Sequence, residues 1–579
     1  MTMTKDVHSW ISAFATTLPG EEAADLFAPG GAWRDIVAFS WNLRTFEGQD
    51  AIRAMLRARG VQVAASGFVV EAPEAAQEGF FRFGTALGRG RGYLRLENGR
   101  ALTLLTALEE LKGHEEPLGQ RRHSGVADPG DMRSWAERRH DEQEGFGPDH
   151  APQVLIVGGG QGGLALAARL RMLNVPALVI DRHPRIGDQW RKRYRSLSLH
   201  DPVWYDHMPY LPFPQHWPVY TPKDRIADWL EAYANILELN VWTDAECLSA
   251  EPGEKGAPWR VRVRRGARDI ELRPVELVMA VGNAGYPRMP DFAGADRFQG
   301  QLLHSSAHSG GEGMGGKRVV VIGANNSAHD IAADLVESGA SVTMVQRSST
   351  LIVRQETLMK RMVRPLWSEE AEARGLSTEL ADLLGVSLPI RMQEAFSRDG
   401  WTAIAEADAP FYERLRAAGF ALDFGPDGTG LGMKYLRTAS GYYIDVGASD
   451  MIADGRIALR SGVDVKQLEP AGVRLSDGSL LEADVVVCAT GFGSMEEWVE
   501  RLISPDVAAR IGRCWGYGSG MPGDPGPWDG ELRNMWKPTA QEGLWFHGGN
   551  LAQSRFYSRA LALQLKARFE GLPVEPLIG

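Results

Sequence analysis

The apolar positions of the chain fall into short runs that alternate with turns and amphipathic segments. Four apolar residues at 154–157 are followed by a glycine-rich segment and then by an Ala/Leu-rich segment at 164–171. An uninterrupted apolar run of this length is typical of a strand buried on both faces, and an Ala/Leu-rich segment is typical of a helix. The same order returns at residues 318–333, and further apolar runs follow at 176–181 and 341–346. The pattern therefore predicts two α/β units in one chain.

Period-two alternation predicts antiparallel strands outside these two units. Apolar and basic residues alternate at 259–264, and a short run at 270–273 completes a predicted hairpin. Residues 472–480 carry an Asp-Gly step between two strand-like pieces, which indicates another hairpin. Apolar runs at 276–281 and 483–489 predict two more buried strands. Amphipathic segments at 359–367, 376–388 and 411–420 predict helices.

The first 125 residues have a pattern of their own. Apolar residues at helical spacing near Trp10, and again after a turn at Gly48, predict two helices. Strand-like pieces lie at 32–39, 67–71, 79–83, 92–97 and 100–108. Together they predict a small α+β unit. Residues 126–150 are polar, charged and bounded by Gly and Pro, so we expect a linker with room for one solvated helix.

Composition narrows the class of protein. At 579 residues the chain is too long for one hydrophobic core, so we expect two to four domains. The net charge of -11 argues against a general nucleic-acid binder, because neutralising phosphates needs a basic surface. The three cysteines are far apart and lack a C-x-x-C pair, so we expect neither a redox dithiol nor a metal site. The chain begins without an apolar signal segment, and no apolar run approaches the roughly 20 residues of a membrane span, so we expect a cytoplasmic protein.

The first glycine-rich segment has the chemistry of a phosphate-binding turn. Gly158, Gly160 and Gly163 have the spacing G-x-G-x-x-G between a predicted strand and a predicted helix. In such a turn the first glycine permits the tight bend, the second lets the backbone approach a pyrophosphate, and the third lets helix and strand pack closely. The next strand ends at Asp181, whose carboxylate can accept a hydrogen bond from a ribose hydroxyl. We therefore predict a dinucleotide site here.

The second segment is an imperfect copy of the first. Gly323 keeps the place of the first glycine, Asn325 replaces the second and can tolerate a positive φ, and Ala328 replaces the third. The strand that follows ends at Arg347, where the first copy has Asp181. A carboxylate suits a free ribose hydroxyl and a guanidinium suits a 2′-phosphate. The first site is therefore predicted to hold FAD and the second NADPH.

Several spaced motifs lie between and after the two turns. Residues 187–223 contain a G-x-x-W step ending at Trp190, an L-x-L-H step ending at His200, a P-F-P step and a Y-x-P-K step. An F-x-G-x-x-x-H motif ends at His304, and an A-T-G step follows the strand at 483–488. These motifs resemble the flavin-containing monooxygenases, most closely the plant YUCCA-type branch, over about residues 152–570. In that family the segment at 443–447 re-enters the first nucleotide domain.

The resemblance implies a reaction. NADPH would reduce FAD, and the reduced flavin would take O2 to form a C4a-hydroperoxide that transfers one oxygen atom to a small organic substrate. Oxygenation of nitrogen or sulfur and oxidative decarboxylation of a 2-oxo acid both remain open. Baeyer-Villiger insertion is less favoured, because His308 stands where enzymes of that related branch carry Trp. Arg354 lies only approximately where those enzymes have a functional arginine, so it receives no role. A different class also remains open, an NADPH oxidase or a flavin-dependent ligand sensor.

The candidate site residues come from these motifs. His304, Ser305 and His200 are the candidate catalytic residues, although His304 fits equally well as a linker histidine held by the backbone. The helix that follows Asn550 should direct its N-terminus at the flavin. The predicted cofactor-binding residues are Gly158, Gly160, Gln161, Gly162, Gly163, Asp181, Arg182, Gln189, Trp190, Leu199, His200, Gly282, Gly323, Asn325, Asn326, Ser327, Arg347, Ser348, Thr490, Gly491, Asn550 and Ser554.

The N-terminal unit carries a second resemblance. Its pieces around Leu26, Trp33 and the 46–52 segment resemble the SnoaL-like branch of the NTF2-like fold. In that family Trp33 and Asp35 would lie near the mouth of a pocket. The residues themselves favour a plainer interpretation, in which Asp35 ends a strand and the unit serves dimerisation or lid packing.

The predicted fold class is therefore α/β, with two Rossmann-like dinucleotide-binding domains preceded by a small α+β NTF2-like cone. We expect the cone at 1–125, the linker at 126–150, the first part of the FAD domain at 151–305, the NADPH domain with a helical lid at 306–440 and the second part of the FAD domain at 441–579. The expected partners are a small organic substrate and O2, with neither nucleic acid nor membrane. Whether the protein forms a homodimer is left open.

Overall fold

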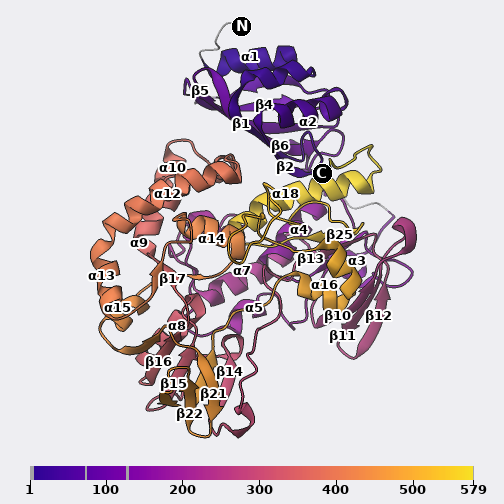
Figure 1. Ribbon diagram of the computed structural model, residues 1–579. Coiled ribbons are helices and arrows are strands. Elements are labelled where there is room, and N and C mark those ends of the chain that lie inside the picture. Colours follow the sequence, from indigo (N-terminus) through magenta and orange to yellow (C-terminus); the bar gives the residue numbers. More distant parts are fainter. Residues whose placement is uncertain (1–5, 72–74, 126–129, 578–579) are drawn as a thin grey trace.

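The N-terminal unit is a curved sheet with helices packed on it (Figure 1). The computed structural model describes residues 6–71, 75–125 and 130–577. The six strands have the order β2-β1-β6-β5-β4-β3, and β1 pairs with β6 in parallel while the other pairs are antiparallel. The strands are β1 Phe27–Ile36, β2 Leu43–Glu47, β3 Ser66–Val70, β4 Glu78–Gly84, β5 Gly88–Glu97 and β6 Arg100–Leu111, and the helices are α1 Val7–Thr17, η1 Glu21–Leu26 and α2 Gly48–Val63. The predicted α+β character is confirmed.

Residues 130–150 contain one helix, α3 Trp135–Glu144, as the linker pattern predicted, whereas linker residues 126–129 lie outside the described residues. The helix is tied to the edge strand of the first nucleotide sheet. Gln143 donates to the carbonyl of Val241 at 2.7 Å, and Trp135 donates to Glu238 at 2.9 Å. The helix is therefore exposed but docked.

The first nucleotide domain is built on a parallel sheet with the order β25-β13-β7-β8-β9. Its strands are β7 Val154–Val157, β8 Ala177–Ile180, β9 Val241–Trp242, β13 Glu276–Met279 and β25 Leu544–Phe546, and α4 Gln161–Met172 follows the glycine turn. The C-terminal helix α18 Leu551–Phe569 packs against α4. Three helices lie between β8 and β9, namely the short α5 Asp188–Arg191 and α6 Val203–Asp206 and the longer α7 Lys223–Ile236. The predicted hairpin at 259–273 is part of a three-stranded meander of β10 Ala245–Glu251, β11 Arg260–Arg265 and β12 Arg268–Leu272.

The second nucleotide domain has a parallel sheet with the order β14-β24-β15-β16-β20. Its strands are β14 Gln301–His304, β15 Arg318–Ile322, β16 Ser341–Gln346, β20 Ile457–Ser461 and β24 Val485–Cys488, and α8 Asn326–Glu337 follows its turn. The predicted hairpin at 472–480 is present as β22 Gly472–Leu475 and β23 Leu480–Glu482, which form a meander with β21 Val465–Glu469.

The division of strands between the two sheets corrects the expected boundaries at 305 and 440. β14 precedes 305 and β20 and β24 follow 440, yet all three hydrogen-bond within the second sheet. The segment at 443–447 does not re-enter the first sheet either. It begins within β19 Tyr442–Asp445, which pairs with β17 Thr350–Arg354 beside β18 Leu422–Asp423. Short apolar strands look alike in sequence, and their partners are chosen by long-range pairing.

The insertion at 355–438 is mostly helical, as predicted. It contains α9 Gln355–Leu358, the π-helical turn Met359–Val363, α10 Glu369–Ala373, α11 Thr378–Gly385, α12 Ile390–Ala407, α13 Ala409–Ala417 and α14 Gly430–Thr438. The long helix α12 was not predicted. The remaining α-helices of the described residues are α15 Ala448–Ala453, α16 Glu496–Leu502 and α17 Pro505–Ile511. No helix in the described part of the chain is both long and apolar enough to cross a membrane.

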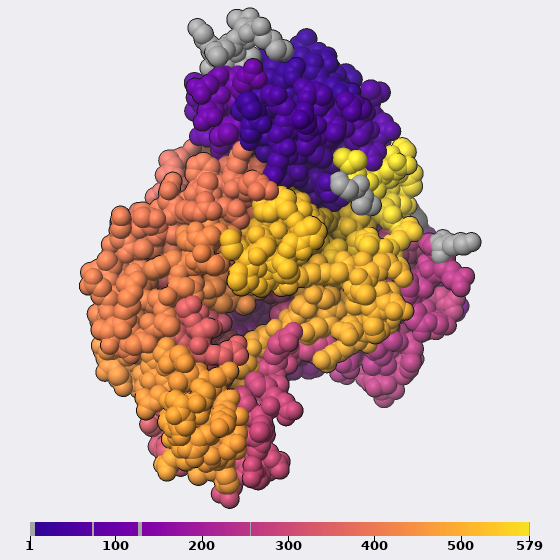
Figure 2. All heavy atoms as spheres, in the orientation of Figure 1, coloured from indigo at the N-terminus to yellow at the C-terminus, as the bar shows by residue number. Residues whose placement is uncertain are grey.

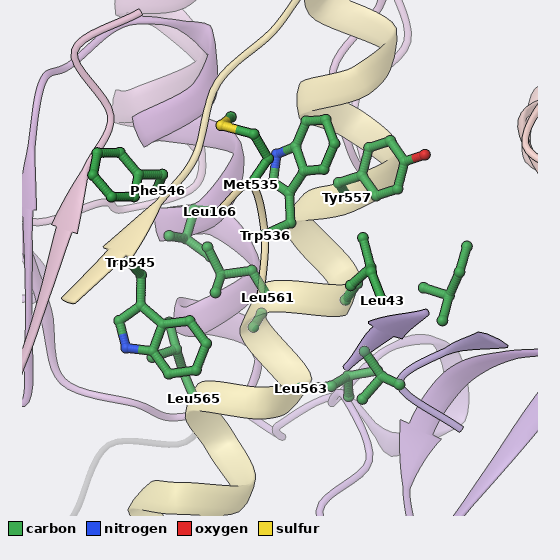
Figure 3. Packing of buried hydrophobic residues seen from close by; sticks show 14 of the residues in the cluster. Leu43, Leu166, Met535, Trp536, Trp545, Phe546, Tyr557, Leu561, Leu563 and Leu565 are labelled. Atoms are coloured by element: carbon green, nitrogen blue, oxygen red, sulfur yellow. The ribbon is translucent and has the colours of Figure 1, made fainter. Parts of the chain in front are cut away.

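The N-terminal unit sits directly on α18 (Figure 1), and both share one hydrophobic core. Leu43 of β2 lies among side chains of α18 and of the segment at 535–546 (Figure 3). The space-filling view shows the N-terminal unit seated on the insertion and on the C-terminal segment, with a hollow below them between the two nucleotide domains (Figure 2). The molecule is therefore not a loosely linked chain of domains.

Candidate functional site

The glycine turn between β7 and α4 has the backbone geometry that the sequence predicted. Gly158 has a φ of +114°, and a Cβ there would lie 2.3 Å from the carbonyl oxygen of Ala280. A Cβ on Gly163 would lie 1.9 Å from the carbonyl oxygen of Gly158. The first and third glycines are therefore required by the fold itself, whatever is bound.

The second glycine, Gly160, is not required by the fold. A Cβ on Gly160 would meet only the Gln189 side-chain amide, at 3.6 Å, so the fold leaves room for one. Gly160 is also the N-cap of α4 and supplies no side-chain cap, so the first backbone N–H groups of the helix remain available. An anion at this helix N-terminus would occupy the open space beside Gly160 and accept from those N–H groups.

A cavity of about 270 Å³ lies along this turn. Eight of the predicted residues line it, namely Gly158, Gly160, Gln161, Gly162, Asp181, Arg182, Gln189 and Gly282. Both polar atoms of the Gln189 amide are buried without a protein partner, which is the state expected of a group that bonds to a ligand. The carboxylate of Asp181 accepts from the N–H of Gly159 at 2.7 Å and of His183 at 2.8 Å. It keeps further lone pairs for a ribose hydroxyl.

Sequence reasoning missed part of this cavity wall. Tyr286 and Trp498 pack against each other with ring centroids 4.0 Å apart, and both line the cavity. The other missed residues come from β10, α16 and the turn before α18, and burial raises the pKa of the Cys247 thiol among them to about 12. They are Ala245, Glu246, Cys247, Leu502, Gly548 and Gly549, and the ends of β7, β8 and β13 add Val157, Ile180, His183, Ala280 and Val281. Of these, only Gly548 and Gly549 carried a signal, because a Gly-Gly step before a helix start indicates close backbone approach.

The turn between β15 and α8 repeats the first. Gly323 has a φ of +124°, and a Cβ there would lie 2.4 Å from the carbonyl oxygen of Ala489, just as Gly158 faces Ala280. Ala328 is buried in the place of the third glycine. Asn325 corrects one expectation, because its φ is −103° and no positive φ is needed there. The side chain of the next residue, Asn326, accepts from the N–H of Ile444 at 3.0 Å and so ties the turn to β19.

Arg347 lies at the carboxyl end of β16, in the place that Asp181 has in the first unit. Its side chain is 75% exposed, and its nearest acidic partner, Asp464, is 3.9 Å away. Ser348 is exposed beside it, and Ser327 is half-buried in the first turn of α8. The guanidinium is therefore free to meet a phosphate that binds at this edge of the sheet.

His304 occupies the junction between the two sheets. Its Nε2 donates to the carbonyl of Gly491 at 3.0 Å, and its Nδ1 accepts from the N–H of Ser306 at 3.1 Å. Burial lowers the pKa of the imidazole, so the neutral ring is favoured. With both ring nitrogens engaged, the geometry favours the linker role over a direct catalytic one. Ser305 is buried at the start of the turn after β14.

Thr490 and Gly491 also belong to this junction and do not line the 270 Å³ cavity. The hydroxyl of Thr490 donates to the carbonyl of Arg288 at 2.6 Å, and the N–H of Arg288 donates to Gly491 at 3.0 Å. The two chain segments that connect the sheets are thus held side by side. These residues set how the two nucleotide sites face each other.

His200 lies between the two nucleotide domains. Its Nε2 is 3.9 Å from the carboxylate of Asp330 on α8, and Gln355 donates to its carbonyl at 2.9 Å. Burial raises the pKa of Asp330, and its carboxylate also accepts from the hydroxyl of Tyr194. Leu199 precedes His200 in the same loop, and Trp190 belongs to α5; both lie outside the cavity wall, and the indole N–H of Trp190 is buried without a partner.

The start of α18 reaches the same region. Asn550 caps the helix by accepting from the N–H of Gln553 at 2.9 Å, and its amide donates to the hydroxyl of Tyr205 at 3.1 Å. The hydroxyl of Ser554 is buried without a partner. Asn550 and Ser554 lie just beyond the cavity, whose wall ends at Gly549.

Asp35 of the N-terminal unit is fully buried rather than at the mouth of a pocket, and so is Trp33. The Asp35 carboxylate accepts from the N–H of Ser40 at 2.8 Å and from the hydroxyl of Thr106 at 2.6 Å. Burial raises its pKa to about 6, while these hydrogen bonds lower it. The carboxylate closes a turn inside the sheet, which agrees with the plainer interpretation.

Comparison with known proteins identifies the class of the molecule. The family described as pyridine nucleotide-disulphide oxidoreductase matches residues 155–381. The indole-3-pyruvate monooxygenase YUCCA1 of Oryza sativa subsp. japonica is 32% identical over 352 residues, which is 60% of this chain and 79% of that protein. The probable indole-3-pyruvate monooxygenase YUCCA9 of Arabidopsis thaliana is 30% identical over 351 residues, or 60% and 76% of the two chains.

Two solved structures share the fold at lower identity. A cyclohexanone monooxygenase bound to epsilon-caprolactone superposes with a TM-score of 0.52 and 17% identity over 72% of this chain and 88% of that one. OTEMO in complex with FAD and NADP superposes with a TM-score of 0.53 and 15% identity over 73% and 85%. Together with the two nucleotide turns and the matched motifs, the relatives show that this chain belongs to the family of flavin-dependent monooxygenases that includes the YUCCA enzymes.

Proposed function

We propose that this monooxygenase holds FAD at the first nucleotide turn and NADPH at the second, and transfers one oxygen atom from O2 to a small organic substrate. The observation that carries the proposal is the pair of turns on one chain, of which the first ends in Asp181 and the second in Arg347. The open space at Gly160 and the orphaned Gln189 amide fit a bound dinucleotide. The bound flavin supplies hydride acceptance and the activation of O2.

The protein's own residues bind, orient and exclude water. The N–H groups at the start of α4 would hold the pyrophosphate of FAD, and Asp181 would accept from its ribose. The N-terminus of α18 carries a partial positive charge and would stabilise negative charge on the flavin ring. His304 would act as a positioning residue that fixes the junction between the two sheets.

The type of oxygenation is narrowed by one residue. His308 is buried at the place of the aromatic residue that the Baeyer-Villiger branch carries, with its Nε2 3.9 Å from Asp334. We therefore favour oxygenation of nitrogen or sulfur, or oxidative decarboxylation of a 2-oxo acid. An NADPH oxidase is the alternative, and the ratio of product formed to NADPH consumed separates the two.

We also propose that residues 7–111 form a SnoaL-like, NTF2-like unit. The curved sheet with its single parallel pair, β1 with β6, and its helices packed on one side support this assignment. The burial of Asp35 supports a packing role for the unit rather than a second active site.

The role of Arg347 is tested by its removal. In Arg347→Ala the Michaelis constant for NADPH should rise about 10- to 100-fold, because a charge-assisted hydrogen bond to the 2′-phosphate contributes about 1.5–3 kcal/mol. The constant for NADH should stay unchanged, since NADH lacks that phosphate.

Arg456→Ala is the matched control. Arg456 is also an exposed arginine of the second domain, with an acidic neighbour, Asp454, at 3.8 Å, but it precedes β20 and so lies at the opposite edge of the parallel sheet. Its removal should leave both constants unchanged. Equal effects of Arg347→Ala on NADPH and NADH would exclude the 2′-phosphate role.

A further inference from the structure

A second cavity lies beside the first turns of α18. Gly548 and Gly549, just before this helix, line the dinucleotide cavity, whereas Ala552 and Gln553, just inside it, line the second one. The start of α18 therefore lies between the two spaces. The second cavity has a volume of about 160 Å³, which is room for on the order of ten water molecules. A group bound in it would lie at the end of α18 that faces the proposed flavin site.

Five aromatic side chains line this cavity together with several aliphatic ones. Trp536 and Tyr557 stack with ring centroids 3.9 Å apart and an interplanar angle of 7°, and Tyr205 packs edge-on against Trp367 at 4.8 Å. Phe556 completes the aromatic lining, and the amides of Gln393 and Gln553 are uncharged polar groups of the same wall. Such walls suit a flat apolar body that carries few hydrogen-bonding atoms.

The N-terminal unit contributes one side chain, Arg34, to the wall of this cavity. Arg34 of β1 is 4% exposed, and its guanidinium makes a bidentate contact with Glu531 at 2.7 and 2.6 Å. It also donates to the carbonyl of Val386 in the helical insertion at 2.5 Å and to the hydroxyl of Tyr557 on α18 at 3.2 Å. One residue of the N-terminal unit thus joins three segments that form the cavity wall.

The charges on the described wall are fully compensated. Arg34 is its one cation, and its charge is already matched by Glu531. The other charged wall residue, Asp382, makes a bidentate contact with Arg555 at 2.7 and 2.6 Å. A carboxylate entering the cavity would therefore lose its hydration and meet two carboxylates without any free cation. An uncharged group would meet no such penalty.

We propose that this cavity receives an uncharged substrate with an aromatic body, such as an aryl sulfide, and that Arg34 makes the N-terminal unit part of the substrate site. The proposal rests on the monooxygenase function proposed above and selects oxygenation of a soft atom over decarboxylation of a 2-oxo acid. For a sulfide, a sulfur lone pair forms an S–O bond with one atom of O2 and the O–O bond breaks. The other oxygen leaves as water, with two electrons and a proton from NADPH and a second proton from solvent.

The first experiment compares substrates that differ only in charge. FAD-loaded protein is titrated calorimetrically, without NADPH, with methyl phenyl sulfide, with 4-(methylsulfanyl)benzoate and with phenylpyruvate. The neutral sulfide should bind at least tenfold more tightly than either anion. Equal or tighter binding of an anion overturns the proposal.

The same compounds are then assayed with NADPH, and product is compared with peroxide. Sulfoxide formed in proportion to NADPH consumed is the expected result. If the sulfide binds more tightly but all NADPH appears as peroxide, the monooxygenase function fails while the neutral binding site stands. If phenylpyruvate is the coupled substrate, the function stands and the present inference fails.

A charge variant tests the role of Arg34 directly. Glu531→Gln removes the negative charge that balances Arg34, so the affinity for 4-(methylsulfanyl)benzoate should rise about tenfold while that for the neutral sulfide changes less than twofold. Glu47→Gln is the control, because Glu47 is a partly exposed glutamate of the N-terminal unit paired with an exposed arginine, Arg391, at 2.9 Å and lies outside the cavity. The proposal fails if Glu531→Gln leaves the anion affinity unchanged. Should that variant not fold, the comparison of substrates on the unaltered protein decides alone.

Discussion

In the first nucleotide turn, some glycines are required by the fold and another is required by the ligand. The distance from an added Cβ atom to its nearest neighbour distinguishes the two kinds of glycine. Gly163 has a backbone oxygen at 1.9 Å from where its Cβ would be, whereas Gly160 has nothing nearer than a side-chain amide at 3.6 Å. The first value excludes any side chain at Gly163, whereas the second leaves room for a methyl group at Gly160 in the absence of ligand.

This difference predicts opposite outcomes for two alanine substitutions. Gly160→Ala should fold with an unchanged melting temperature in the absence of FAD but bind FAD at least tenfold more weakly, because its methyl group occupies the space for the pyrophosphate. Gly163→Ala should lower the melting temperature of the FAD-free protein, because helix and turn must separate. Thermal unfolding and fluorescence titration with FAD measure both. Equal losses of stability in the two variants would contradict this assignment.

The candidate catalytic residues show the limit of sequence at this scale. The F-x-G-x-x-x-H motif located His304 but could not tell a reacting imidazole from one held at both nitrogens, as it is by Gly491 and Ser306. Its partners depend on the approach of a segment from another part of the chain. His200 was likewise found by motif, while its acidic neighbour Asp330 belongs to the other domain and carried no signal.

At the scale of secondary-structure elements, helix α18 has a capped N-terminus beside the proposed flavin site. Asn550 and Gln553 form a capping box, and the same arrangement is made by Ser134 and Glu137 at the exposed helix α3. Both caps satisfy backbone N–H groups in the same way, but only that of α18 faces the proposed flavin site.

These two caps form a matched pair for a test. Asn550→Ala should destabilise the protein by about 1 kcal/mol, and it should slow reduction of the flavin by NADPH about two- to fivefold, because a frayed helix end holds negative charge less well. Ser134→Ala should weaken its own helix without changing the reduction rate. Stopped-flow absorbance measures the rate and urea unfolding measures the stability. If the two substitutions slow reduction equally, the cap of α18 has no special role.

The elements themselves were largely predictable, whereas their partners were not. The two strand-turn-helix units, both hairpins and the helical insertion follow from periodicity and turn residues, which are local. The assignment of β14, β20 and β24 to the second sheet was not predictable, because a short strand with a few apolar residues can pair equally well in either parallel sheet. Helix α12 was missed although apolar residues such as Trp401 and Ile404 are buried on one face of it.

For the whole molecule, the decisive feature is that the N-terminal unit and the first nucleotide domain share a core. Buried residues of both belong to one hydrophobic cluster, and the buried pair of Arg34 and Glu531 crosses between them. The backbone N–H of Leu577 also donates to the carbonyl of Ser40 at 2.8 Å across the same boundary. The unit is therefore an integral part of the enzyme.

This continuity predicts a single cooperative unfolding transition for the two parts. Arg34→Ala leaves Glu531 buried without its cation, which should cost about 3–5 kcal/mol and separate the transition into two. Differential scanning calorimetry measures the number of transitions. Two transitions in the unaltered protein would show that the parts unfold independently, and an unchanged single transition in the variant would show that the buried pair does not join them.

The sequence by itself determined the two nucleotide turns and the class of chemistry they serve. Those features depend on local backbone requirements, a positive φ at Gly158 and Gly323 and clearance at Gly163, and residue type records such requirements directly. Only the tertiary structure decided which strands share a sheet and that Arg34 contacts Glu531, Val386 and Tyr557. It also decided that the charges of Arg34 and Glu531 balance each other beside α18. These facts depend on residues hundreds of positions apart, and no periodicity or spacing along the chain specifies which distant side chains will meet.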